Sequence, residues 1–100
     1  MITIIILAAG SSSRMRGRDK LLEKIDDIPL LRQQALAALA VSNDVIITLP
    51  PAPHPRYRTV SDLNVSPLSV KDATEGISAS IRTAIKSLSQ KTTKAMLLLA

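Results

Sequence analysis

The sequence predicts an α/β layered domain with a mostly parallel sheet. Apolar runs at residues 2–8, 45–49 and 95–100 have the composition of buried strands, and the first is continuously apolar and β-branched, as in a strand covered on both faces. Segments with helical spacing separate these runs. Because the chain has 100 residues and is 46% hydrophobic, it can bury one core, and we expect one domain.

A loop and the start of a helix are expected after the first strand. Residues 9–27 carry glycine, serine and charge, which predicts a loop with room for a short turn of helix. A helix is expected to begin near Asp27, because Asp26 or Asp27 can accept hydrogen bonds from the free N–H groups of its first turn. Pro29 suits that turn, where its missing donor is not needed.

The helix is expected to continue through LLRQQALAALA and to end by Ser42. Its apolar spacing predicts that Leu31, Ala35 and Leu39 face inward. The positions expected to face outward are Arg32, Gln33 and Gln34. A second buried strand follows at residues 45–49, and a crossover of this length favours a parallel, right-handed βαβ unit.

The second half of the chain continues the alternation. Proline-rich residues 50–55 end the second strand, and His54 among them is interpreted as a solvated loop residue. Residues 59–71 have a weaker β pattern interrupted by a proline, which predicts a short or edge strand. Residues 72–90 predict an amphipathic helix, and residues 95–100 a further buried strand.

Composition restricts the class of partner. The formal charge of +5 and the pI near 10.1 favour a negatively charged ligand without choosing among nucleotide, nucleic acid and lipid headgroup. Tyr57 is the only aromatic residue, which argues against a single-strand nucleic acid binder, and no long basic helix is predicted.

The longest apolar run, residues 2–9, is far shorter than the roughly 20 residues of a membrane span. Without cysteine, the chain suits a reducing cytoplasm.

The segment after the first strand is the expected ligand site. In parallel sheets, ligands bind beyond the carboxyl ends of the strands where the strand order reverses. Two familiar phosphate loops are excluded here: Met15 stands five residues after Gly10, which rules out a P-loop, and Ser12 replaces the second glycine of the dinucleotide fingerprint.

This segment nevertheless has the groups that a nucleotide needs. Its first residues are small and let a base or ribose lie close to the backbone: Ala8, Ala9 and Gly10. The hydroxyls of residues 11–13 and nearby N–H groups can line an anion-binding concavity. Arg14 offers a fork that matches phosphate oxygens, and Lys20 supplies a compact charge. Asp19 is interpreted as a local charge partner of Arg18 and Lys20.

The stretch LAAGSSSRMRGRDKLL resembles the signature of nucleotidyltransferases that activate a phosphate-bearing acceptor with a nucleoside triphosphate. The likeness is closest to the molybdenum cofactor cytidylyltransferase and guanylyltransferase group. GISASIR, residues 76–82, is similar to a second segment of the cytidylyltransferase-like members, and the likeness spans essentially the whole chain. It implies a three-layer α/β/α Rossmann-like nucleotidyltransferase fold with a mostly parallel sheet.

The resemblance also implies roles for individual residues. Arg14 and Lys20 are expected to bind phosphates and act in catalysis, with Mg²⁺ as cofactor. The expected nucleotide-binding residues are Leu7, Ala8, Ala9, Gly10, Ser12, Ser13, Gly76 and Ser78. The implied reaction transfers a nucleoside monophosphate from CTP or GTP to a phosphate-bearing acceptor of the molybdopterin type and releases pyrophosphate.

The family places a metal-binding aspartate directly after the strand that corresponds to residues 95–100, where this chain ends. We therefore expect residues 1–100 to be the N-terminal, nucleotide-binding part of a single domain, with no metal ligand assigned in them. Two alternatives stay open. One is a sugar-1-phosphate nucleotidyltransferase, which shares the fold and a related first motif, and the other is a nucleotide-binding module without turnover.

Overall fold

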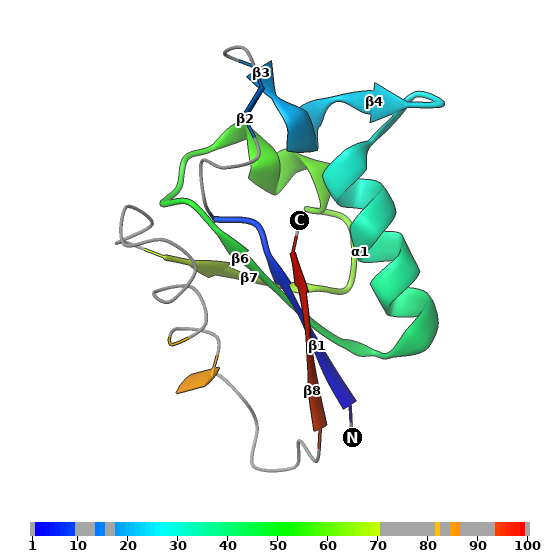
Figure 1. Cartoon of the computed structure of the whole chain (residues 1–100), viewed down its shortest axis with the longest axis vertical. Helices are drawn as coiled ribbons and strands as arrows, with labels where there is room; N and C mark the ends of the chain where they lie inside the picture. Colours follow the sequence, from blue (N-terminus) through cyan, green and yellow to red (C-terminus); the bar gives the residue numbers. More distant parts are fainter. Residues whose placement is uncertain are drawn as a thin grey trace.

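A parallel sheet of four strands forms the centre of the structure (Figure 1). Its strands lie in the order β7 (Ser66–Ser69), β6 (Asp44–Leu49), β1 (Ile2–Leu7) and β8 (Lys94–Leu99), and every pairing between them is parallel. The computed structural model describes residues 2–9, 14–15, 18–70, 82, 85–86 and 94–99. The prediction of an α/β fold with a mostly parallel sheet is confirmed.

Strand β1 is covered on both faces, as its unbroken apolar sequence predicts. Ile4 and Ile6 pack into the larger core cluster, whereas Ile5 and Leu7 belong to a second cluster with Ile46. The two sets alternate along the strand because successive side chains point to opposite faces of a sheet. β1 therefore connects the two halves of the core.

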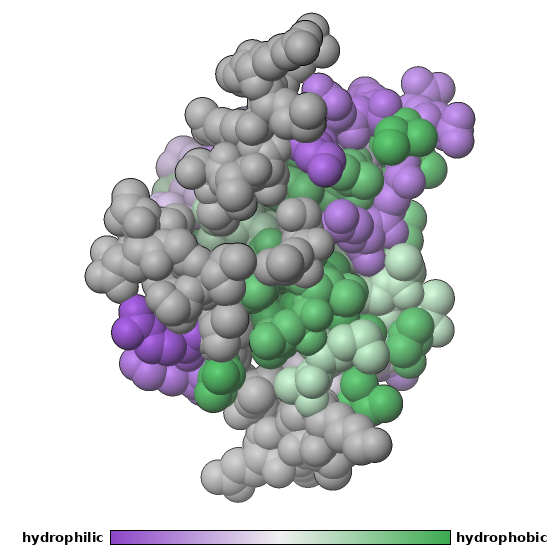
Figure 2. Space-filling view, in the orientation of Figure 1, coloured by the Kyte–Doolittle hydropathy of each residue, from purple (hydrophilic) through white to green (hydrophobic). Residues whose placement is uncertain are grey.

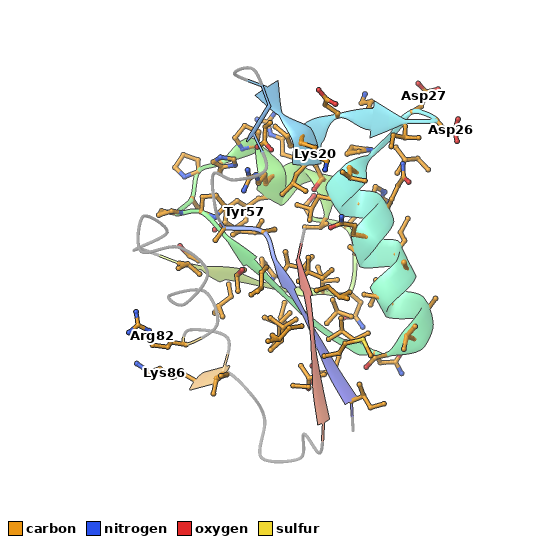
Figure 3. The ribbon with its side chains drawn as sticks, viewed as in Figure 1. Lys20, Asp26, Asp27, Tyr57, Arg82 and Lys86 are labelled. Carbon is orange, nitrogen blue, oxygen red and sulfur yellow. The ribbon has the colours of Figure 1, made fainter. Side chains whose placement is uncertain are left out.

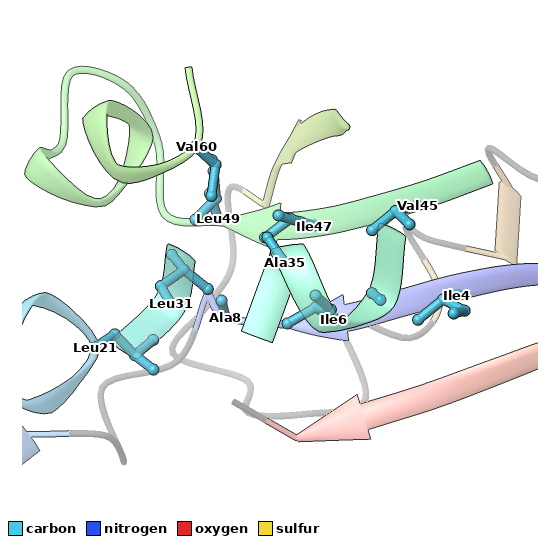
Figure 4. Packing of buried hydrophobic residues seen from close by; sticks show 11 residues of the cluster. Ile4, Ile6, Ala8, Leu21, Leu31, Ala35, Val45, Ile47, Leu49 and Val60 are labelled. Carbon is cyan, nitrogen blue, oxygen red and sulfur yellow. The ribbon is translucent and has the colours of Figure 1, made fainter. Parts of the chain in front are cut away.

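Helix α1 (Leu30–Val41) covers one face of the sheet and supplies much of the larger cluster (Figure 4). Leu31 and Ala35 are fully buried, as their spacing predicts, and Ala38 is buried beside them. Leu39 is only partly buried at the margin of the cluster, so the apolar face of the helix is centred on the two alanines. Small residues at these positions let the helix lie close to the sheet.

The predicted start of the helix is wrong. Asp26 and Asp27 form the tip of a hairpin between β4 (Lys24–Ile25) and β5 (Ile28–Pro29), and they project away from the helix in Figure 3. Both have positive φ values, 54° and 64°, as a two-residue hairpin turn requires, and aspartate tolerates this region better than most residues. The helix begins one residue after Pro29, at Leu30, whose N–H donates to the Glu23 carbonyl at 2.8 Å.

The rest of the segment between β1 and α1 has more structure than the expected loop. β2 (Arg14–Met15) and β3 (Arg18–Asp19) form an antiparallel pair, and the 3₁₀ helix η1 (Lys20–Leu22) follows. The turn of helix was predicted, but strands of two residues are too short to show an alternating pattern. Leu21 in η1 is fully buried in the larger cluster and fixes this segment to the core.

The connection after β6 includes a second 3₁₀ helix, η2 (Pro55–Thr59). His54 lies in a loop, as expected, but it is only partly exposed and also caps η2, because its Nδ1 accepts a hydrogen bond from the Arg56 N–H at 3.2 Å. The chain then enters β7, the predicted short edge strand, which tolerates Pro67 beside Ile47 of β6.

The prediction of a buried strand at residues 95–100 is corrected: β8 pairs with β1, but its side chains at residues 95–98 are exposed. Met96, Leu97 and Leu98 are 47%, 47% and 38% exposed. Figure 2 shows a hydrophobic area in the centre of the face on which Figure 1 places β8. This strand lies at the edge of the sheet, so its side chains lack a neighbouring strand on one side. Most of the predicted helix 72–90 lies outside the described residues; Arg82, Ile85 and Lys86 are helical and exposed. In the described part of the chain, no helix has the length and apolar character needed to cross a bilayer.

Candidate functional site

The strand order reverses at β1, which places the expected ligand site at the end of this strand. From β1 the chain moves outward to β6 and β7 on one side, and it returns to β8 on the other side of β1. Parallel strands separated in this way leave a crevice at their carboxyl ends. The segment from Ala8 to Lys20, called the nucleotide loop below after the ligand expected from the sequence, begins there.

The base of the nucleotide loop is anchored to the neighbouring strand. The Ala8 N–H donates to the Thr48 carbonyl at 3.0 Å and lies 3.2 Å from the Thr48 hydroxyl oxygen. Leu7, Ala8 and Ala9 are all buried, and Ala9 packs against Val70. These three predicted nucleotide-binding residues therefore form a buried floor at the end of β1.

A buried arginine connects the two ends of the nucleotide loop. Arg56 of η2 is 1% exposed, and its Nη1 donates to the Ala8 carbonyl at 2.6 Å. Its Nε and Nη2 donate to the two carboxylate oxygens of Asp19, at 2.7 Å and 3.1 Å. The interpretation of Asp19 as a partner of Arg18 and Lys20 is therefore corrected: its partner is an arginine distant in the sequence.

The electrostatics of Asp19 follow from this pairing. Burial by itself raises the pKa of the Asp19 carboxyl, but the hydrogen bonds and charge of Arg56 lower it, with further lowering by the Leu21 N–H and the charge of His54. The net pKa lies below the ordinary value of 3.8. Asp19 is thus held as a carboxylate at neutral pH.

Lys20 follows Asp19 directly and is exposed at the start of η1 (Figure 3). The pairing of β2 with β3 places the backbone of Arg14 opposite Asp19, the neighbour of Lys20. The hairpin therefore brings the backbones of the two predicted catalytic residues to one end of the nucleotide loop. The exposed ammonium group of Lys20 is a compact charge that can neutralise phosphate oxygens.

The other predicted site residues lie outside the part of the chain that the structure describes. They are Gly10, Ser12, Ser13, Gly76 and Ser78, together with the side chain of Arg14. Their roles stay predictions. Conversely, Thr48 and Arg56 were missed, because nothing in their local sequence shows that they contact a loop some 40 residues away.

A magnesium site was tested against the side chains at this end of the sheet. Among the described residues, no group of three His, Cys, Asp or Glu side chains is placed to hold a metal ion. Asp19, the acidic residue of the nucleotide loop, has both carboxylate oxygens bonded to Arg56. The described side chains therefore offer no group of ligands that would hold Mg²⁺ by themselves.

The pairing of Asp19 predicts an acid-sensitive contribution to stability. Near neutral pH, Asp19→Asn is expected to lower the free energy of unfolding by about 1.5–3 kcal/mol, because charge-assisted hydrogen bonds to Arg56 are weakened. Since the folded-state pKa lies below 3.8, this contribution is complete above that value and is lost as the pH falls through the folded-state pKa. Urea unfolding of both proteins at about pH 7, 5 and 3 measures the difference.

The matched control is Asp62→Asn, which disrupts an exposed pair with Arg32. Exposed pairs contribute little, so this variant is expected to differ little from the original protein at any of these pH values. A difference for Asp19→Asn that stayed constant down to the lowest pH would contradict the proposed ionisation.

Comparison with known families was made for the whole chain. A family model described as "MobA-like NTP transferase domain" matches residues 4–100. No curated protein and no solved structure gives a significant match.

Proposed function

Because the chain belongs to the MobA-like NTP transferase domain family, and is therefore a nucleotidyltransferase domain, we propose that it transfers a nucleoside monophosphate from CTP or GTP to a phosphate-bearing acceptor of the molybdopterin type. The observation that carries this proposal is the position of the nucleotide loop. It leaves the central strand at the reversal of strand order, with a buried floor at one end and the exposed Lys20 at the other. That arrangement suits a triphosphate lying along the loop.

The proposed reaction requires little covalent participation by the protein. A phosphate oxygen of the acceptor attacks the α-phosphorus of the triphosphate, and the bond from that phosphorus to the oxygen bridging to the β-phosphate breaks. The electron pair leaves with pyrophosphate, and the acceptor gains a nucleotide through a new diphosphate linkage. Negative charge increases on the leaving oxygens, where Lys20 and the Arg14 side chain are proposed to neutralise it.

Mg²⁺ is proposed to accompany the triphosphate, which would supply oxygen ligands of its own. When bound, it would supply positive charge that stabilises the phosphate groups. The described residues are proposed to act separately from the metal. Ala8 and Ala9 would limit the space available to the nucleotide at the end of β1, and Lys20 would provide a positive charge.

The test is pyrophosphate release from CTP, GTP and UTP, each with molybdopterin or with a sugar 1-phosphate as acceptor, in the presence of Mg²⁺ or of EDTA. We expect release from CTP or GTP only with molybdopterin and Mg²⁺. Release from UTP with the sugar phosphate would favour the sugar-1-phosphate alternative. Nucleotide binding without release under any condition would favour a non-catalytic module and would contradict the proposed reaction.

A further inference from the structure

We propose that Arg56 is a positioning residue for the nucleotide loop: by binding Ala8 and Asp19 at once, it fixes both ends of the segment that receives the triphosphate. This inference deepens the proposed function and rests on it for its consequence in binding. The contacts that carry it are independent of that function, because they join three described residues from three separate parts of the chain.

The guanidinium group acts as a rigid spacer between the two ends. Each of its three nitrogens donates to the loop: Nη1 to the Ala8 carbonyl, and Nε and Nη2 to the two oxygens of Asp19. Because the guanidinium is planar and its donors have fixed directions, neither end of the loop can shift without losing a hydrogen bond. A lysine ammonium at this position would keep the charge but not this geometry.

The backbone of Arg56 is itself held from both sides. Its N–H donates to His54 Nδ1 at 3.2 Å, and its carbonyl accepts from the Thr59 hydroxyl at 2.7 Å. The neighbouring Tyr57 hydroxyl donates to the Pro50 carbonyl at 2.6 Å, which ties η2 back to the end of β6. Arg56 is therefore connected to β6, the same strand that binds Ala8 through Thr48.

The effect of Arg56 reaches Lys20 through Asp19. The Asp19 carboxylate also accepts from the Leu21 N–H at 3.1 Å and so caps η1, whose Leu21 is fully buried. Lys20 lies between these two fixed residues. Arg56 thus fixes the position of the Lys20 backbone, although the Arg56 side chain itself is buried.

Burial argues that the main role of this ion pair is geometric. The Arg56 and Asp19 side chains are 1% and 11% exposed, and removing both charges from water offsets much of their attraction. A hydrophobic pair could provide similar net stability at this position. What it could not provide is a fixed distance between a backbone carbonyl and a carboxylate at opposite ends of a loop.

The protein contains a matched control for this arrangement. Arg32 of α1 also binds both oxygens of an aspartate, Asp62, at 2.6 Å and 3.0 Å, and it also donates to a backbone carbonyl, that of Thr59, at 3.2 Å. This second pair is exposed, and the hydrogen-bond partners of Arg32 that the structure describes, Thr59 and Asp62, lie outside the nucleotide loop. Arg32→Lys therefore removes the same chemistry at a position that contacts η2, through the Thr59 carbonyl, but not the loop itself.

The experiment compares Arg56→Lys with Arg32→Lys in the full chain. Amide hydrogen exchange is measured across residues 8–22 and across α1, together with nucleotide affinity and kcat and KM for pyrophosphate release. All measurements are made well below the thermal midpoint of each variant. We expect Arg56→Lys to accelerate exchange in residues 8–22 but not in α1, and to weaken nucleotide affinity about tenfold or more with a matching rise in KM. Arg32→Lys is expected to leave these values within about twofold.

If Arg56→Lys does not fold, Asp19→Glu replaces it in the same measurements, because it keeps the charge and lengthens the side chain by one methylene. The same changes are expected from it. The inference is overturned if the folded variant shows the exchange and affinity of the original protein, or if Arg32→Lys weakens affinity equally, which would indicate a loss of overall stability. If the original protein neither binds nucleotide nor releases pyrophosphate, the proposed function is refuted. The comparison of amide hydrogen exchange between Arg56→Lys and Arg32→Lys would still test whether Arg56 positions the loop.

Discussion

Lys20→Ala is expected to lower the rate of pyrophosphate release by about 10²-fold or more, as when a preorganised contact to the transition state is lost. Lys20 is exposed at the start of η1, between Asp19, which Arg56 holds, and the buried Leu21. Its backbone is therefore fixed while its ammonium group can reach a ligand. Since negative charge increases on the leaving phosphate oxygens in the transition state, kcat should fall more than the affinity for the nucleotide.

The control for this prediction is Lys24→Ala. Lys24 is also an exposed lysine, and it lies on β4, beyond η1 and outside the nucleotide loop. It has the same charge, so a general loss of attraction for anions would affect both variants alike. An unchanged rate in Lys20→Ala, or an equal fall in both variants, would remove Lys20 from the catalytic residues. Arg14→Ala is expected to behave like Lys20→Ala.

The sheet and its helix could be predicted because their signals are local. The apolar runs of β1 and β6 and the helical spacing in α1 are each visible within one segment, and the length of the crossover favours parallel pairing. The hairpin tip at Asp26 and Asp27 was misinterpreted because aspartate suits a helix cap and a turn equally well. Which of these forms depends on the neighbouring two-residue strands, which have no pattern of their own.

The nucleotide loop could be located from the sequence, but the contacts that hold it could not. The order of strands and the small residues after β1 indicated its position. Arg56 follows the proline-rich residues 50–55, where no local pattern indicates a role for it, and only the folded chain brings it to Ala8 and Asp19. Similarly, the exposure of β8 depends on its place at the edge of the sheet, and an apolar sequence alone does not distinguish an edge strand from a central one.

The largest expected effect on stability comes from the strand that supports the nucleotide loop. Ile6→Ala should lower the free energy of unfolding by about 2–5 kcal/mol, because it removes buried methylene groups and leaves a cavity under α1. Ile6 is fully buried between the sheet and the helix, and it lies two residues before Ala8 in the central strand. Ile25→Ala removes the same atoms from a side chain that is 54% exposed on β4, and it should cost no more than about 0.5–1 kcal/mol.

Urea unfolding measures the free energy of unfolding of both variants, provided that the denaturant dependence, m, is the same in each. A loss in Ile6→Ala that was no larger than in Ile25→Ala would contradict the core described for Ile6. If Ile6→Ala is too unstable to measure, Ile6→Val is expected to lose about 0.5–1.5 kcal/mol and replaces it in the comparison. Because Ile6→Val removes one buried methyl group and leaves the hydrogen bonds of Arg56 in place, nucleotide affinity measured on the folded fraction should stay unchanged in this variant. Stability of β1 and the geometry of the nucleotide loop would then be separate properties, the first determined by the packing of β1 and the second by Arg56.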